Sequence, residues 1–248
     1  MEQNGGKFFN PARIAAIAMF SALAGILYIF NFPMPFAFPG FLEFKFSDIP
    51  VLIGSFALGP VSGAIIVVVQ ILIKLVFTGT STAFVGELSD LLTCCAFSVT
   101  AGLIYSKKRT FKGALIAIAS GMAAEVAVAL LANRFILVPF FVKQYGWSAI
   151  IGMMLKLFPE CTEQNFYNYY LWVSVLPFNL LRCIVAALVT LPVYKRISVI
   201  LNKFNDKITP KDDGDGKKAK RVNLAVILTF AGLVALLITF ALLRYFVF

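Results

Sequence analysis

The stretch Phe41-Leu-Glu-Phe-Lys-Phe-Ser-Asp-Ile-Pro50 decides the fold, because it joins two long apolar runs of the chain. Its first half alternates aromatic and charged side chains. Its second half has the residue types that begin a helix, since Ser or Asp can cap free backbone amides and Pro fits the first turn. A connector between two membrane helices normally needs only a few polar residues. The segment 32–47 is longer and rich in Pro and Phe, which indicates a lid over a pocket.

The composition of the 248-residue chain is typical of a polytopic membrane protein. Hydrophobic residues make up 60% of the chain, charged residues make up 14%, and the mean hydropathy is +0.88. The hydrocarbon core of a bilayer is about 30 Å thick and requires about 20 apolar residues per helix. Runs of about this length recur along the whole chain, so we expect an all-α membrane fold. No small-residue cleavage site follows the first run, and we expect that run to be kept.

The number of membrane segments depends on whether residues 49–77 form one helix or two. A single helix would be about 43 Å long at 1.5 Å per residue, which is too long for the core without strong tilt. Gly59-Pro60 lies inside this stretch, and Pro removes a helix hydrogen bond. We therefore predict a break there. The apolar segments are then 12–31, 48–58, 60–77, 87–106, 113–138, 170–194 and 222–246.

The distribution of Lys and Arg orients these segments in the membrane. With the break, 15 of the 22 basic residues lie on one side: in the N-terminal tail, in the 107–112 loop and after the sixth segment. Basic residues concentrate on the cytoplasmic side of membrane proteins. We therefore expect a multi-pass membrane protein with a cytoplasmic N-terminus and an extracellular C-terminus. The net charge of +10 is explained in this way, and we expect no nucleic-acid partner.

This topology divides the chain into four parts. They are a cytoplasmic N-terminal tail (1–11), a six-helix membrane domain (12–196), a basic cytoplasmic linker (197–221) and an additional transmembrane helix (222–248). The glycines of the linker do not form a P-loop, because the pattern G-x-x-x-x-G-K-[ST] is missing. The chain has no His, and its four Cys have neither zinc spacing nor a disulfide pattern. We expect no metal, no cofactor and no enzymatic activity.

Polar and ionisable side chains within the apolar segments concentrate toward the outer face. Such groups are costly in hydrocarbon and usually face a cavity or a partner. Asn179 and Arg182 are three residues apart, so they share one face of a helix. Aromatic walls with a few polar groups are typical of ligand pockets. We predict an outward-facing pocket lined by Phe44, Phe46, Glu87, Asp90, Asn133, Asn179 and Arg182.

Several of these positions also have a simpler structural interpretation. Glu87 and Asp90 can stabilise a helix N-terminus, where negative charge is favourable. Arg134 can extend its charge to the membrane interface, so we leave it outside the site. Glu125 lies deep in the fifth segment and needs a partner, which the sequence does not identify. Lys74 faces either the cavity or the helix bundle.

Small residues on the first segment suggest a second functional surface. Ala18 and Ala22 have the small-xxx-small spacing that lets two membrane helices approach closely. Packing inside the protein would explain this spacing. A docking face for another membrane subunit would explain it equally well.

The order and spacing of six short motifs point to a family. The motifs are Ala18-Met-Phe-Ser-Ala-Leu-Ala24, Phe44-Lys-Phe-Ser-Asp-Ile-Pro-Val-Leu-Ile53, Gly59-Pro-Val-Ser-Gly63, Gly86-Glu-Leu88, Ala132-Asn-Arg-Phe-Ile-Leu-Val-Pro139 and Pro177-Phe-Asn-Leu-Leu181. Over about residues 10 to 200 the chain resembles the S components of energy-coupling factor (ECF) vitamin transporters. It is most similar to the riboflavin-specific members, the RibU family.

The resemblance implies a six-helix bundle with a ligand pocket near the outer face, covered by the connector after the first helix. It implies that riboflavin, or an FMN-like flavin, is the transported ligand, and that Asn133 and Asn179 hydrogen-bond to the flavin or its ribityl chain. It also implies that Ala18 and Ala22 contact the transmembrane coupling subunit. Two ATPase subunits would then drive uptake while the S component reorients in the membrane.

Two positions depart from the family pattern. Arg182 stands where we expect Lys, and Asp90 stands where we expect Asn. Arg and Lys are not interchangeable at a shaped polar site, so an S component for a different vitamin is an alternative. A stand-alone secondary transporter is another alternative. Such proteins often consist of paired halves with broken helices, and the sequence shows no internal repeat.

Overall fold

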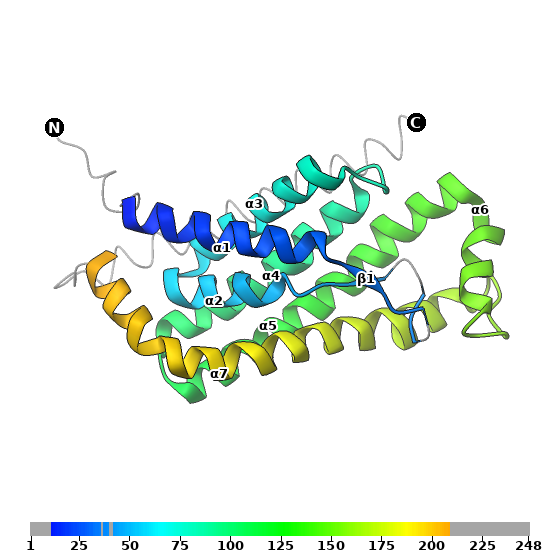
Figure 1. Ribbon diagram of the computed structural model, residues 1–248. Coiled ribbons are helices and arrows are strands. Elements are labelled where there is room, and N and C mark those ends of the chain that lie inside the picture. The colour runs from blue at the N-terminus through cyan, green and yellow to red at the C-terminus, as the bar shows by residue number, and fades with distance from the viewer. Residues whose placement is uncertain (1–10, 36, 40–41, 209–248) are drawn as a thin grey trace, which may run out of the picture.

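The apolar segments form long helices that run along a broadly common direction (Figure 1). The computed structural model describes residues 11–35, 37–39 and 42–208, with side chains up to residue 193. Within them, five helical stretches are long and apolar enough to cross a bilayer: Pro11–Ile29, Pro60–Thr78, Val85–Lys107, Phe111–Leu155 and Asn168–Val193. The predicted all-α polytopic class is confirmed. The predicted N-terminal tail up to residue 10 and the predicted helix 222–248 lie outside the described residues.

The elements follow the predicted segments closely over the first half of the chain and extend beyond them in the second half. Their order is α1 (Pro11–Ile29), β1 (Phe32–Pro33), β2 (Glu43–Phe44), α2 (Asp48–Leu58), α3 (Pro60–Thr78), α4 (Val85–Lys107), α5 (Phe111–Ala132), η1 (Asn133–Leu137), α6 (Val138–Leu155), η2 (Asn168–Val175) and α7 (Leu176–Ile208). The elements η1 and η2 are π-helical, with wider turns than an α-helix.

The predicted break between the second and third segments is present. Gly59 ends α2 with a φ of 90°, a left-handed conformation that Gly adopts without steric cost. Pro60 then opens α3, where its missing N–H removes no helix hydrogen bond. The short helix α2 has only 11 residues, and it packs against α1, α3, α4 and α7. Neighbouring helices therefore shield it, as we expected from its length.

Arg13 of α1 stabilises the break between α2 and α3 through hydrogen bonds to both helices. Its Nη2 atom donates to the backbone oxygen of Leu58 at 2.5 Å and to the Oγ atom of Ser62 at 3.0 Å. The last carbonyl groups of a helix have no partner within the helix, and a positive charge is favourable at that end. Arg13 therefore stabilises the C-terminus of α2 and holds the first turn of α3 beside it.

The predicted helix start after Phe46 is confirmed, but the expected capping is wrong. The helix α2 begins at Asp48, as predicted. Within the described residues, the hydroxyl group of Ser47 makes no capping hydrogen bond, and its backbone is already helical with φ −61° and ψ −24°. The Asp48 carboxylate instead turns into the bundle, where Arg182 lies.

The lid, which we define as residues 32–47, is folded onto the bundle. The strands β1 and β2 pair in an antiparallel arrangement with Phe32 opposite Phe44 (Figure 1). Phe44 and Phe38 form a buried cluster with Phe178 of α7, and the rings of Phe38 and Phe178 meet edge to face at 5.2 Å. Such edge contacts between aromatic rings are favourable. The phenylalanines of the lid therefore hold it against α7.

The two π-helical elements have a common cause in the sequence. The element η1 ends two residues before Pro139, and η2 ends two residues before Pro177. Proline lacks an N–H group, and its ring crowds the preceding turn, so an α-helix that continues through proline must rearrange locally. A wider π-turn achieves this without ending the helix. The fifth and sixth predicted segments therefore continue as longer, distorted helices.

Two helix ends differ from the predicted segments. Helix α6 continues the fifth segment from 138 to Leu155, with a bend at Gly146, whose φ is 79°. Helix α7 continues to Ile208, so the first twelve residues of the predicted linker 197–221 are helical. The rest of that linker lies outside the described residues.

Candidate functional site

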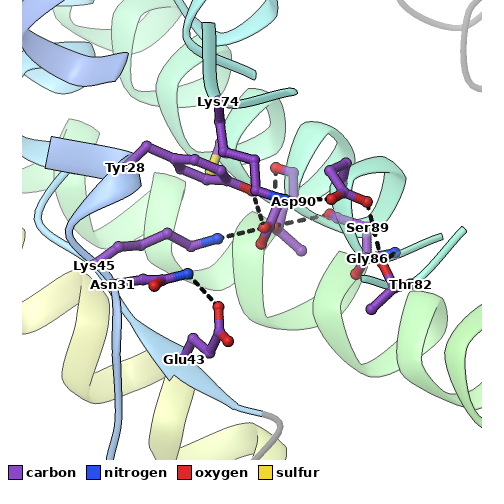
Figure 2. Close-up of polar contacts among 12 residues, drawn as sticks. Tyr28, Asn31, Glu43, Lys45, Lys74, Thr82, Gly86, Ser89 and Asp90 are labelled. Atoms are coloured by element: carbon purple, nitrogen blue, oxygen red, sulfur yellow. Dashed lines mark hydrogen bonds and ion pairs between the residues drawn. The ribbon is translucent and has the colours of Figure 1, made fainter. Parts of the chain in front are cut away.

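A cavity of about 190 Å³ lies under the lid, where the ends of α1, α3, α4 and α5 meet α7. Figure 2 shows its polar side chains converging from α1, the lid, α3 and α4. Five of the predicted site residues line this cavity: Glu87, Asp90, Asn133, Asn179 and Arg182. The structure thus brings together side chains from three helices that are up to 95 positions apart in the sequence.

The two predicted phenylalanines do not line this cavity. Phe44 is buried, with 4% of its surface exposed, because its ring packs against Phe178. Phe46 is 37% exposed, and its ring contacts those of Phe32 and Phe44, meeting Phe44 edge to face. The aromatic walls of the cavity come instead from three other residues: Tyr28, Phe141 and Phe178.

The two asparagines share one local geometry. The Nδ2 atom of Asn133 donates to the backbone oxygen of Ala129 at 2.8 Å, and that of Asn179 donates to Val175 at 2.8 Å. Both carbonyl groups belong to the preceding turn, next to a π-helical element. Tyr170 also donates its hydroxyl to Asn133 Oδ1 at 2.5 Å. An Asn side chain has two donors and one oxygen with two acceptor positions. These bonds fix both amides and leave each with hydrogen-bonding capacity for a ligand.

The first ion pair of the cavity joins the lid to α4. The Nζ atom of Lys45 contacts the Asp90 carboxylate and lies 4.1 Å from the centre of the Tyr28 ring. Tyr28 also donates its hydroxyl to Asp90 (Figure 2). Lys45 is only 6% exposed, and a buried cation is stable only with such partners. The predicted N-terminal stabilisation of α4 is therefore not the main role of Asp90.

The second ion pair joins α3 to α4. Lys74 Nζ donates to Glu87 Oε1 at 2.5 Å, and Glu87 Oε2 accepts hydrogen bonds from the hydroxyls of Thr80 and Thr82 at 3.0 and 3.1 Å. Lys74, whose direction the sequence left open, therefore faces the cavity. Glu87 holds the loop between α3 and α4 in place, in addition to lying in the first turn of α4.

Arg182 lies at the centre of a third group of charges, deeper in the bundle. Its Nε atom is 2.8 Å from an Asp48 oxygen, its Nη2 atom contacts Glu125, and its Nη1 atom is 4.0 Å from Asp90. The thiol of Cys183 also donates to Glu125, at 2.8 Å. Arg182 is thus the partner of Glu125 that the sequence did not identify. Two opposite charges in neighbouring apolar segments were the available signal, since isolated charges are rare in membranes.

The remaining predicted positions lie outside the cavity. Ala18 and Ala22 are exposed on the outer face of α1, so packing within the described bundle does not explain their spacing. Arg134 is exposed and lies 4.6 Å from the centre of the Tyr167 ring. This position agrees with our exclusion of Arg134 from the site.

The cavity has the composition of a ligand-binding site. Three aromatic side chains form part of its wall, two oriented amides face it, and its charged groups are held by ion pairs. Pockets that bind small molecules usually combine apolar walls with a few fixed polar groups. The lid covers the cavity on one side.

Comparisons with known proteins agree with this description. Residues 12–194 match the family model described as "ECF transporter, substrate-specific component". The chain is 29% identical to the riboflavin transporter RibU of Staphylococcus aureus over 192 residues, which cover 77% of this chain and 93% of the relative. It is 31% identical to RibU of Lactococcus lactis over 199 residues, which cover 76% and 95%. The riboflavin transporter FmnP of Bacillus subtilis is 22% identical over 178 residues, which cover 71% and 87%.

A solved structure shares the architecture. The S component of a bacterial ECF transporter superposes with a TM-score of 0.59 and 28% identity, covering 76% of this chain and 96% of that chain. These relatives are transporter components and not enzymes. Because the family match spans well over half of its residues, the chain belongs to the substrate-specific components of ECF transporters.

Proposed function

We propose that the chain is the riboflavin-binding subunit of an ATP-driven ECF transporter and that the cavity under the lid holds the vitamin. The observation that carries this proposal is the meeting of Asn133, Asn179 and Arg182 in one cavity beneath the lid. The names of three relatives from different bacteria, all riboflavin transporters, support the choice of ligand. In this proposal the aromatic walls contact the flavin ring, and the two amides hydrogen-bond to its polar groups.

The size of the cavity indicates that the lid moves when the ligand enters. Pockets for drug-sized ligands usually measure about 300 to 1,000 Å³, and this cavity measures about 190 Å³. Among its described residues, the lid is held by the phenylalanine cluster on α7, by the contacts of Lys45 with Asp90 and Tyr28, and by a contact between Asn31 and Glu43. Opening of the lid would admit the vitamin, and its closure would bury the flavin.

The outer face of α1 is the proposed contact with the coupling subunit. Ala18 and Ala22 are exposed there and are one turn apart. Small side chains let two membrane helices approach closely, which favours their association. We further propose that two ATPase subunits drive uptake, that the S component reorients to release the vitamin inside the cell, and that its N-terminus is cytoplasmic.

A vitamin titration tests the proposed ligand. The full-length chain, purified in detergent and again in lipid nanodiscs, is titrated with riboflavin while the flavin fluorescence is recorded. We expect saturable quenching with a stoichiometry of one flavin per chain. Thiamine, biotin and folate serve as competitors and should not displace riboflavin.

The titration also separates this proposal from its alternatives. Displacement of riboflavin by another vitamin at lower concentration would replace the ligand and keep the family assignment. Absence of saturable flavin binding in both detergent and lipid would contradict the proposal. Uptake by this chain in vesicles without ATPase subunits would instead indicate a stand-alone transporter.

A further inference from the structure

The charges around the cavity indicate whether the cavity accepts an uncharged or an anionic form of its ligand. Three cationic side chains line the cavity among the described residues: Lys45, Lys74 and Arg182. Each of them is already in contact with a carboxylate. Lys45 contacts Asp90, Lys74 contacts Glu87 at 2.5 Å, and Arg182 contacts both Asp48 and Glu125. The cavity therefore offers an incoming anion no cation that lacks a partner.

Asp90 is the carboxylate of this set that is most exposed to the cavity. Its side chain is 23% exposed, whereas the Glu87 side chain is 6% exposed and those of Asp48 and Glu125 are 3% and 0% exposed. Tyr28 and Lys45 both bind its Oδ2 atom (Figure 2). Arg182 lies 4.0 Å from its Oδ1 atom. A ligand in the cavity would thus lie beside a fixed negative charge that also neutralises Lys45.

This arrangement favours the binding of uncharged ligands over that of anionic ligands. A phosphate group would have to displace Asp90 from Lys45, or lose its hydration next to the Asp90 carboxylate. Like charges brought together at a desolvated site are strongly unfavourable, and proteins use such repulsion to reject wrong ligands. A hydroxyl or amide group needs only hydrogen-bond partners, which Asn133 and Asn179 provide. An uncharged ligand therefore enters without disturbing the ion pairs.

We propose that Asp90 is a specificity-determining residue, which keeps Lys45 occupied so that the cavity accepts uncharged riboflavin and rejects its 5′-phosphate ester. This inference rests on the proposed function, because it concerns the same cavity and the same flavin. It goes beyond that function by assigning the choice between two flavins to one ion pair.

The test compares the two flavins on the full-length chain. Dissociation constants for riboflavin and riboflavin 5′-phosphate are measured by fluorescence quenching at a fixed, moderate salt concentration. The unaltered protein should prefer riboflavin by at least about tenfold, which corresponds to a difference of about 1.4 kcal/mol in binding free energy. Asp90→Asn removes the negative charge and leaves the Lys45 cation available to the phosphate. We expect this variant to reduce the preference about tenfold or to reverse it.

A matched control separates the ion pair from the total charge of the cavity. Glu43→Gln also removes one carboxylate from the cavity wall, but Glu43 contacts Asn31 and so releases no cation. The preference of this control should stay within a factor of about two of the unaltered protein, because no phosphate-binding group is gained. If Asp90→Asn does not fold, Lys45→Met replaces it. That variant leaves the Asp90 charge without its lysine and should increase the preference for riboflavin.

The outcomes distinguish this inference from the proposed function. If the protein binds neither flavin, the proposed function is contradicted together with the inference. If it binds both flavins equally, only the inference is overturned. The same holds if Asp90→Asn keeps the original preference, or if Glu43→Gln changes it as much as Asp90→Asn does.

Discussion

Arg182 lines the cavity and also forms ion pairs with carboxylates in the interior of the bundle. Its guanidinium group contacts carboxylates from α2, α4 and α5, and only 4% of the side chain is exposed. A buried charge that loses its partner destabilises a protein by about 3–5 kcal/mol. Arg182 therefore has a structural role in addition to any contact with a ligand, and the two roles must be measured separately.

Arg182→Ala should reduce both stability and ligand affinity. The substitution leaves Asp48 and Glu125 without their shared cation in a part of the protein that excludes water. We expect a loss of about 3–5 kcal/mol in unfolding free energy, and a severe loss of riboflavin binding in protein that remains folded. Thermal unfolding in detergent and the riboflavin titration measure the two effects. Arg134→Ala is the control, because Arg134 is exposed and lies outside the cavity. A normal melting temperature for Arg182→Ala would contradict the role of the buried ion pairs.

Five of the seven predicted ligand-binding residues could be placed at the cavity from sequence alone. Glu87, Asp90 and Arg182 carry charges in apolar segments, and such residues normally face a cavity or a partner. The sequence could not show that Lys45 and Tyr28 complete the group, because a lysine in a connector and a tyrosine at a helix end are common surface residues. The same limit explains Phe44, whose alternation with charges predicted a lid but not the side of the lid on which its ring lies.

At the scale of elements, a π-helical element lies next to each asparagine of the site, but only one of them precedes its asparagine. Pro139 and Pro177 each follow a π-helical element. Asn133 is the first residue of η1, and Asn179 lies four residues after the end of η2. A π-turn displaces the following residues around the helix axis relative to a regular α-helix. The distortion of η2 thus helps to turn the Asn179 amide toward the cavity.

Pro177→Ala should reduce affinity without reducing stability. Alanine restores an N–H donor and favours a regular helix, which would turn Asn179 relative to the opposite wall. We expect the riboflavin dissociation constant to rise about tenfold, equivalent to about 1.4 kcal/mol, with an unchanged or higher melting temperature. Pro192→Ala is a matched control, since Pro192 also lies inside α7 but not at the cavity. An unchanged affinity for Pro177→Ala would show that the proline does not position the amide.

Ala18→Leu combined with Ala22→Leu should separate binding from uptake. Both residues are exposed on α1 and neither lines the cavity, so riboflavin affinity should be unchanged. The larger side chains prevent close approach of another helix, and uptake of labelled riboflavin by cells should be lost. Met19→Leu with Ile26→Leu is the control, because both residues are exposed on the same helix. Normal uptake in the alanine variant would place the coupling interface elsewhere.

The helices themselves were predictable to different degrees. The Gly59-Pro60 break and the start of α2 followed directly from local rules, and both were correct. Helix α6 was missed because its residues mix apolar and polar types around Gly146. The π-helical elements have no distinct sequence pattern apart from the proline that follows them.

At the scale of the whole molecule, the site depends on one part of the chain. All described residues that line the cavity lie between Tyr28 and Arg182, and the family match covers 12–194. The last described helix, α7, ends at Ile208. The rest of the predicted linker and the predicted extra helix lie outside the described residues.

Truncation after Ile208 should consequently preserve binding. We expect the shortened chain to bind riboflavin within a factor of about three of the full-length affinity, a difference of less than about 1 kcal/mol, since the described cavity residues and the family match both end before residue 195. The fluorescence titration on both chains measures this. A large loss of affinity would show that residues 209–248 take part in the site or in its folding.

The most direct test of the account is the riboflavin affinity of the double variant Asn133→Ala with Asn179→Ala. We expect a folded protein whose dissociation constant is at least about 30-fold higher, because each lost hydrogen bond from a buried amide contributes about 1–2 kcal/mol. Asn168→Ala, a change at an exposed asparagine of η2, should keep the original affinity. Isothermal titration calorimetry gives all three values. A double variant that binds riboflavin as tightly as the unaltered protein would contradict the claim that this cavity holds the vitamin.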